Sequence, residues 1–322
     1  MPTSRSFARQ LGFGRLGYLL WHAPIGAVRR SNAAGGPLQQ LIDVRGRRAM
    51  ERAAARLPTA ADTPAATLPE LHFLTGKKFW FQSAFCLHSL QLHAGMTFRA
   101  VFHDDGSLNR DQQERLKNFF PFSEIRLRVE NDERLAEFLP ATKFPVLQDR
   151  RHRYPNILKL TDVHAGRDGW RLVLDSDMLF FRRPEYVLSW LAAPDRPLHL
   201  VDVANSYGYS RPLMESLAGA EIPSQVNVGL TGLRSDRIDW EQLEFWCRRL
   251  IEAEGTQYYL EQALIAMLVA GQPSAIAPGQ DYVIAPSRAE CLHPTAVLHH
   301  YVAESRRWYF RETWHNGCSP SS

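Results

Sequence analysis

Cysteine is scarce in this sequence and forms no recognisable pattern. Its four cysteines are scattered and no two form a C-x-x-C pair, which argues against both a zinc ribbon and a disulfide framework. A reducing compartment, the cytoplasm, is the simplest inference. Internal repeats and low-complexity tracts are absent as well.

Long apolar runs are also missing. The most apolar stretch near the start, residues 16–28, contains His22 and Pro24, and it falls short of the roughly 18 consecutive apolar residues that a membrane span needs. It has no small-residue cleavage site, so no secretory signal is predicted. The stretch is compatible with a position on a membrane surface and equally with packing against the main domain.

Acidic residues are rare in the first 56 positions, which hold ten arginines against Asp43 and Glu51. This arm therefore carries +8 and the rest of the chain −4, which together make the +4 of the whole. Such an arm favours peripheral contact with an anionic membrane or an acidic partner, and a merely solvated basic face explains it equally well. Nucleic acid is not expected, because no basic module with interleaved aromatic residues follows.

The remaining composition is that of an ordinary globular protein. With 322 residues, of which 45% are apolar, the chain can bury a substantial core. Residues 57–70 are rich in Pro, Thr and Ala, which indicates a linker. We therefore expect an arm and linker over 1–68, one large domain over 69–316 and a short tail over 317–322.

Short apolar runs alternate with helical patterns along the large domain. Strands are predicted at 71–76, 98–108, 123–129 and 171–177, and helices at 79–95, 110–120 and 155–165. This alternation predicts an α/β fold of three layers, in which helices cover both faces of a mostly parallel central sheet.

Polar residues follow three of the predicted strands. They are Thr75 with Gly76, Asp104 with Asp105, and Asp175 with Asp177. Ligands of such sheets collect at the carboxyl ends of the strands, so we expect a binding site at this edge. The D-D-G sequence at 104–106 is also a turn signal, which explains those two acids without a ligand.

Asp175 and Asp177 are the most informative of these residues. Side chains at i and i+2 of a strand share a face, so both carboxylates are expected to point the same way. Their repulsion beside an apolar run is unfavourable unless a proton or cation neutralises it. Mg²⁺ or Mn²⁺ would do so and leave open positions for phosphate oxygens. The alternative is a pair of solvated turn acids.

At this point the sequence resembles a known family. LVLDSDMLFFRRP, residues 172–184, looks like the D-x-D segment of glycosyltransferases with the A-type nucleotide-sugar-binding fold, which is Rossmann-like. VNVGLTGL at 226–233 and YYLEQALIAML at 258–268 are similar to the family's N-x-G segment and acidic-Gln helix. LHHYVAESRRW at 298–308 is similar to the H-x-x-G-x-x-K segment of the family-eight-like enzymes. The resemblance spans about residues 71–308.

The resemblance implies a metal site and a phosphate-binding residue. Asp175, Asp177 and His300 correspond to the ligands of Mn²⁺ or Mg²⁺, and Arg306 replaces the phosphate-binding Lys. Ala303 stands where the family has Gly, which puts a backbone approach to phosphate in doubt. His299 could serve in place of His300, so the register is open by one residue.

Other residues have weaker assignments. Asn227, Glu261 and Gln262 are predicted to act on the donor sugar or acceptor, with Glu261 the first candidate for a general base. Asn227 could instead bond its own backbone, and Glu261 suits a helix start by helix-dipole attraction alone. Lys159 is expected to meet a phosphate or to pair with Asp162. The residues predicted to contact the donor are Thr75, Gly76, Asp104, Asp105, Lys159, Ser176 and Arg306.

The resemblance therefore implies a metal-dependent glycosyltransferase that moves a hexosyl group from a nucleotide sugar, with UDP the expected nucleotide, to a glycan, lipid or small-molecule hydroxyl. Two alternatives stay open. One is a haloacid-dehalogenase-like phosphatase, which also uses D-x-D after an apolar strand. The other is a non-catalytic domain that binds sugar nucleotides, which the loss of Gly at Ala303 keeps in play.

Overall fold

The computed structural model describes residues 36–58 and 68–318, which belong to two compact units divided after Met50. Helix α4 (Gly36–Ala54) crosses this division and was not expected from the sequence. The apolar stretch 16–28, most of the arginine-rich arm, most of the linker and the last four residues lie outside the described residues. The expected limits 1–68, 69–316 and 317–322 stay a prediction. Among the described residues, no helix has the length and apolar character that crossing a membrane requires.

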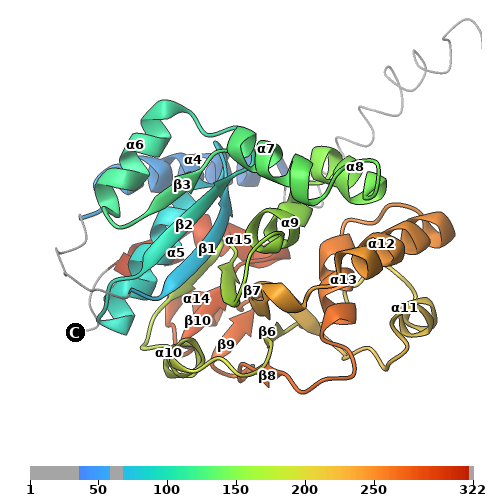
Figure 1. The fold of residues 1–322 in the computed structure, drawn as a ribbon. Coiled ribbons are helices and arrows are strands. Elements are labelled where there is room, and N and C mark those ends of the chain that lie inside the picture. The colour runs from blue at the N-terminus through green and yellow to red at the C-terminus, as the bar shows by residue number, and fades with distance from the viewer. Residues whose placement is uncertain (1–35, 59–67, 319–322) are drawn as a thin grey trace, which may run out of the picture. The chain divides into compact units, whose positions relative to one another are not determined.

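A seven-stranded sheet forms the centre of the second unit, and its order is β3-β2-β1-β4-β7-β6-β8 (Figure 1). Strands β1 to β4 run parallel, β7 runs antiparallel to β4 and β6, and β8 pairs parallel with β6. The predicted α/β class with a mostly parallel sheet is confirmed. The strands are β1 (Glu70–Thr75), β2 (Arg99–Asp104), β3 (Glu124–Arg126), β4 (Trp170–Leu174), β6 (Leu198–Val201), β7 (Val226–Arg234) and β8 (Ala275–Ile276).

A smaller sheet of three strands has the order β5-β10-β9. It consists of β5 (Met178–Phe180), β9 (Tyr282–Ile284) and β10 (Leu298–His300). Because β5 follows β4 after only three residues and pairs antiparallel with β10, the small sheet brings a segment more than 100 residues later in the chain beside the end of β4.

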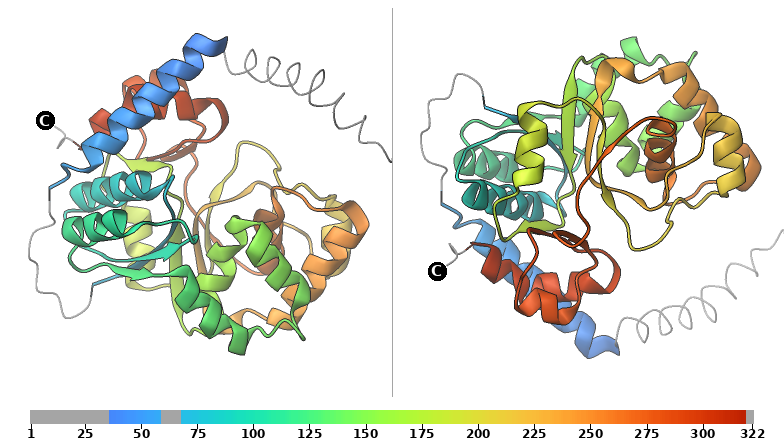
Figure 2. Two further views of the ribbon diagram at one scale, coloured as in Figure 1. Left: turned by 90° about the horizontal axis from the view of Figure 1, so that it is seen from above. Right: turned by 90° about the horizontal axis from the view of Figure 1, so that it is seen from below.

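Helices lie on both faces of the central sheet (Figure 2). Alternate side chains of β1 explain this, because Thr75 bonds Ser83 of α5 on one face while Leu74 packs into the core around α9 on the other. The helices of the second unit are α5 (Trp80–Ala94), α6 (Arg110–Phe119), α7 (Arg128–Phe138), α8 (Pro145–Arg153), α9 (Leu158–His164), α10 (Glu185–Ala192), α11 (Arg211–Ala218), α12 (Trp240–Glu254), α13 (Leu260–Leu268), α14 (Arg288–Leu292) and α15 (Arg306–Arg311). Short 3₁₀ turns cover Pro155–Ile157, Ser235–Arg237, Ala303–Ser305 and Thr313–Cys318.

The predicted strands end earlier than the sequence pattern suggested, and the one expected at 98–108 ends at Asp104 as β2. The strand expected at 123–129 is only β3, because α7 begins at Arg128. The Glu130 side chain accepts the Leu127 backbone N–H at 3.0 Å, which satisfies a donor at the helix start that has no partner within the helix. Strand β4 ends at Leu174, so Asp175 and Asp177 lie in a bend rather than in the strand. The two acids are therefore not strand residues as expected, although their carboxylates do converge on one point.

A buried ion pair fixes α9, the helix that covers β1 and β4. Asp162 of α9 receives the guanidinium of Arg151 from α8 through two hydrogen bonds of 2.9 and 3.1 Å, and both side chains are 1% exposed. Asp162 therefore does not pair with Lys159, which turns to Asp175 instead.

We predict that Arg151→Met destabilises the protein by about 3–5 kcal/mol, because it leaves the Asp162 carboxylate buried without a counter-charge. Urea unfolding monitored by circular dichroism measures this loss. Lys143→Met is the matched control, since Lys143 pairs with Glu241 at the surface and its loss should change stability by less than about 1 kcal/mol. Equal effects of the two substitutions would contradict the prediction.

Candidate active site

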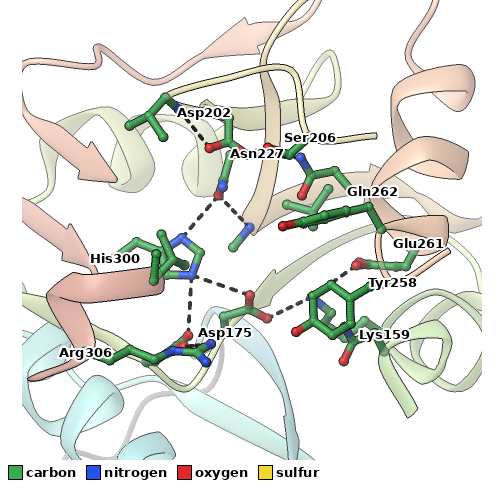
Figure 3. Close-up of a pocket in the computed structure, with 18 of the residues that line it drawn as sticks. Lys159, Asp175, Asp202, Ser206, Asn227, Tyr258, Glu261, Gln262, His300 and Arg306 are labelled. Atoms are coloured by element: carbon green, nitrogen blue, oxygen red, sulfur yellow. Dashed lines mark hydrogen bonds and ion pairs between the residues drawn. The ribbon is translucent and has the colours of Figure 1, made fainter. Parts of the chain in front are cut away.

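A cavity of about 420 Å³ opens at the end of β4 (Figure 3). Its walls come from the bend after β4, the start of β7, α9, α13 and the chain after β10. Eight of the residues singled out in the sequence line it together: Lys159, Asp175, Asp177, Asn227, Glu261, Gln262, His300 and Arg306. Segments up to 147 residues apart in the chain thus converge on one hollow.

The centre of the cavity holds two carboxylates and one imidazole. His300 Nε2 lies 3.7 Å from Asp175 Oδ2 and 3.4 Å from Asp177 Oδ1. One potential ligand atom from each residue lies within 4.8 Å of the others. The pairing of β5 with β10 sets Met178 opposite His300, and this register brings the imidazole to the D-x-D bend.

Asn227 orients the His300 ring. Its Oδ1 accepts the Gly229 backbone N–H at 3.0 Å, so the same oxygen, 3.2 Å from His300 Nδ1, acts as an acceptor there too. With the Nδ1 proton directed to Asn227, the Nε2 atom of His300 faces the aspartates, where it can bind a metal once it has lost its own proton. Gly229 is required for this contact, because a Cβ there would lie 2.4 Å from His300 Cε1.

His299 points elsewhere. Its ring bonds Glu290 Oε1 at 2.9 Å and the Tyr301 hydroxyl at 3.0 Å. Successive strand residues face opposite sides, so His300 is the histidine of the pair that faces Asp175 and Asp177.

Each aspartate also has a cation of its own. Lys159 Nζ lies 2.9 Å from Asp175 Oδ1 and 3.3 Å from Glu261 Oε2, and Arg306 Nη2 lies 3.0 Å from Asp177 Oδ2. Burial opposes ionisation of Asp177, but the hydrogen bond from His300 and the charges of His300 and Arg306 lower its pKa to about 2. The sequence argument assumed that the two carboxylates lack counter-charges within the protein. In the structure, Lys159 and Arg306 supply them. Four carboxyl groups line the cavity, those of Asp175, Asp177, Asp202 and Glu261, and they outnumber the cations Lys159 and Arg306.

Glu261 and Gln262 begin α13 at the opposite wall of the cavity. The Glu261 side chain is only 4% exposed, and burial raises its pKa to about 7 although Lys159 acts in the other direction. Gln262 Nε2 donates to Asp202 Oδ2 at 3.0 Å. At neutral pH Glu261 therefore changes its protonation state easily, while Gln262 is held in place by Asp202.

Ala303 takes a backbone conformation that is typical of glycine. Its φ is +49°, in the left-handed region that residues with a Cβ rarely enter. The turn that leads to Arg306 thus has a geometry typical of glycine, although Ala303 keeps a Cβ that glycine lacks.

Several residues of the cavity were not predicted. They are Tyr154, Asn156, Asp202, Val203, Ser206, Tyr258 and Tyr259. Asp202 directly follows the apolar strand β6, which is the same signal that identified Asp175. The aromatic residues carry no such local signal, since tyrosines serve cores and surfaces alike.

The other predicted donor contacts do not line this cavity. Asp104 accepts the backbone N–H groups of residues 106, 107 and 108, and Thr75 bonds Ser83. A Cβ at Gly76 would lie 2.2 Å from Asp105 Oδ1, so Gly76 lets the Asp105 carboxylate lie against the backbone. Ser176 lies in the bend but outside the cavity. For these five residues a role with the donor stays a prediction.

The sequence matches no family model, and a search of curated proteins found no match. Solved structures do match. The galactosyltransferase LgtC in complex with donor and acceptor sugar analogs is 15% identical, with 77% of this chain and 95% of that chain covered and a TM-score of 0.50. The bifunctional glycosyltransferase WbbM is 10% identical, with 79% of this chain and 51% of that chain covered and a TM-score of 0.51. The chain therefore has the Rossmann-like A-type fold of nucleotide-sugar glycosyltransferases.

Proposed function

We propose that this protein is a glycosyltransferase that moves a hexosyl group from a nucleotide sugar, with UDP the favoured nucleotide, to a hydroxyl acceptor. The acceptor classes are those named above: a glycan, a lipid or a small molecule. The observation that carries the proposal is the convergence of Asp175, Asp177 and His300 in the cavity at the end of β4. The fold supports it, and so does the placement of Arg306 beside Asp177. A cytoplasmic location, with membrane contact through the basic arm, belongs to the same proposal.

The donor set suits Mn²⁺ or Mg²⁺. Two carboxylate oxygens and the Nε2 atom of His300 face one another, and this mixture of hard oxygen and imidazole ligands fits such ions. The leftover negative charge of the cavity favours a cation as well. When bound, the ion would act as a Lewis acid that stabilises negative charge on the departing diphosphate.

The side chains of the cavity would then act by charge and by position. The side chain of Arg306 is 53% exposed, so it can leave Asp177 and reach a phosphate oxygen through its planar fork. Lys159, between Asp175 and Glu261, holds both carboxylates in place. Asn227, Glu261 and Gln262 line the space beside the ion site, where the transferred sugar and the acceptor hydroxyl would lie. Glu261 is the group suited to accept a proton, because its pKa lies near neutrality.

The structure bears differently on the two alternative functions, a phosphatase and a non-catalytic domain that binds sugar nucleotides. The phosphatase alternative is not proposed, because the chain has the A-type glycosyltransferase fold. The non-catalytic alternative loses its motivation at Ala303, whose backbone keeps the left-handed conformation. Donor binding without metal dependence, together with no donor hydrolysis, would favour it again.

Asp177→Asn should lower donor turnover roughly 10²–10³-fold, because it removes a charged ligand next to the departing phosphate. Release of nucleotide from a panel of sugar nucleotides with Mn²⁺ is the measurement. Thermal unfolding is measured in parallel, because the variant also loses the charged contacts of Asp177 with His300 and Arg306. Asp111→Asn is the matched control, as Asp111 pairs with Arg115 at the surface. Full turnover in the Asp177 variant would reject the assignment.

Asn227→Leu should weaken Mn²⁺ binding about 10–100-fold, because the His300 ring loses the acceptor that fixes its orientation. Calorimetric titration of Mn²⁺ into the protein without donor separates this effect from sugar contacts. Asn227→Asp keeps an acceptor oxygen and should retain affinity. Ser206→Ala changes the same cavity without touching His300 and serves as the control. Unchanged Mn²⁺ affinity in Asn227→Leu would show that the contact does not matter.

Glu261→Gln should change how stability depends on pH. The pKa of Glu261 is raised from 4.5 to about 7, so its contribution to stability is complete below pH 4.5 and is lost as the pH rises to about 7. The neutral variant lacks this loss, and its stability relative to the native chain should increase by up to about 3 kcal/mol across that range. Urea unfolding of both proteins at several pH values tests this. Parallel stability curves would mean that Glu261 titrates normally.

A further inference from the structure

A second cavity, of about 450 Å³, lies at the end of the central sheet away from Asp175. Its lining includes Trp170, which begins β4, and Arg234, which ends β7. The ladder of these antiparallel strands places Trp170 opposite Arg234. The other end of the same ladder, where Leu174 lies opposite Leu230, directly precedes Asp175. The two cavities share no lining residue, and the volume of the second is typical of small-molecule sites.

The floor of the second cavity is apolar. Leu233 belongs to the buried core, and Ile238 and Leu268 pack against that core while they line the cavity. The indole of Trp170 adds an aromatic surface that is only partly buried. Apolar surface in such a hollow favours a ligand whose own apolar part displaces the water there. This side of the cavity therefore suits an apolar ring.

Trp170 is held in place by its neighbours. Its ring meets the Trp190 ring edge-on, with the centroids 5.7 Å apart and an interplanar angle of 84°. Trp190 is fixed in turn, because its Nε1 donates to the Arg196 carbonyl at 2.8 Å. Gly232 makes room for it, since a Cβ there would lie 2.4 Å from Trp190 Cη2. A wall that is fixed in advance lowers the entropy lost when a ligand binds against it.

Three arginines line the second cavity against a single carboxylate. Arg196 pairs with that carboxylate, Asp195, at 2.6 Å, and Arg234 pairs with Asp236 at 3.0 Å. Arg237 is exposed and forms no ion pair with any residue that the structure describes. The cavity therefore combines its apolar floor with a positive charge that no carboxylate compensates, and the guanidinium of Arg237 is free to bind an oxyanion.

We propose that the second cavity binds a small molecule in which an apolar ring carries an oxyanion, a phosphate or a carboxylate. The ring lies against Trp170 and Leu268, and the oxyanion accepts hydrogen bonds from Arg237, whose planar fork matches both groups. The side chain of Arg234 is 39% exposed, so it can turn towards the same oxyanion. The proposal does not depend on the proposed sugar transfer, because the site shares no residue with the cavity at Asp175.

Calorimetric titration with 1-naphthyl phosphate, in the presence of EDTA to silence metal-dependent binding, tests the site. The native chain should bind the probe saturably near one equivalent. Inorganic phosphate, which lacks the ring, and 1-naphthol, which lacks the charge, should each bind at least about five-fold more weakly. A parallel titration with 1-naphthoate shows which oxyanion the site prefers. Absence of saturable binding of both naphthyl anions would overturn the proposal.

Arg237→Gln should weaken binding of 1-naphthyl phosphate about ten-fold, because it removes the charged donor. The fold should tolerate the change, since the side chain is exposed and unpaired among the described residues, and circular dichroism verifies this. Arg182→Gln is the matched control, as Arg182 is also exposed and has no ion pair in the described part of the chain. It should change affinity less than two-fold. Equal losses in the two variants would reduce the effect to net charge and overturn the proposal.

A second control excludes the cavity at Asp175 as the place where the probe binds. Arg306 lines that cavity and not the second one, so Arg306→Gln should leave the affinity for 1-naphthyl phosphate unchanged. Loss of binding in this variant, with binding kept in Arg237→Gln, would place the probe at Asp175 and refute the second site.

Discussion

Compensation of two neighbouring negative charges is the constraint on which the rest of the cavity depends. Asp175 and Asp177 lie side by side in the bend after β4, and each is held by a cation from a different segment, Lys159 of α9 and Arg306 of α15. His300 stands between the carboxylates with its Nε2 atom towards them. The buried pair of Arg151 with Asp162 anchors α9, so the position of Lys159 depends on packing far from the cavity. The partners of the two aspartates, Lys159, His300 and Arg306, come together where the small sheet meets the large sheet.

Much of the fold was readable from local patterns. The first two strands, the helix between them, α6, α9, β4 and α13 follow from apolar periodicity and from the residues at their ends. The D-x-D acids were identified as a site because they interrupt an apolar run. The strand argument behind the shared face does not hold, since β4 ends at Leu174 rather than at Asp177, yet the two carboxylates do converge. The turn after β4 and the contacts with Lys159, His300 and Arg306 bring the two carboxylates together. These three residues come from distant segments, which no local sequence pattern connects.

Asp104 and Asp105 show the limit of such reading most clearly. They follow β2 as Asp175 follows β4, and the sequence treats both pairs alike. Around Asp104 the acceptors are satisfied by three backbone N–H groups of the next turn, whereas around Asp175 the partners are a lysine and a histidine from other elements. The difference lies in what the tertiary fold delivers to each carboxylate. Asp202 is the converse case. It follows β6 and accepts a hydrogen bond from Gln262 in the cavity, yet the sequence analysis did not identify it.

Ala303 shows that the backbone conformation of a motif can be kept when its amino-acid sequence changes. With φ at +49°, an alanine occupies a conformation in which a methyl group is tolerated at some expense in energy, and the chain still reaches Arg306. A search pattern that demands glycine rejects this protein at position 303, while a pattern written as backbone dihedral angles accepts it. Distant proteins with such folds are therefore better found by comparing backbone conformation than by comparing residue identity.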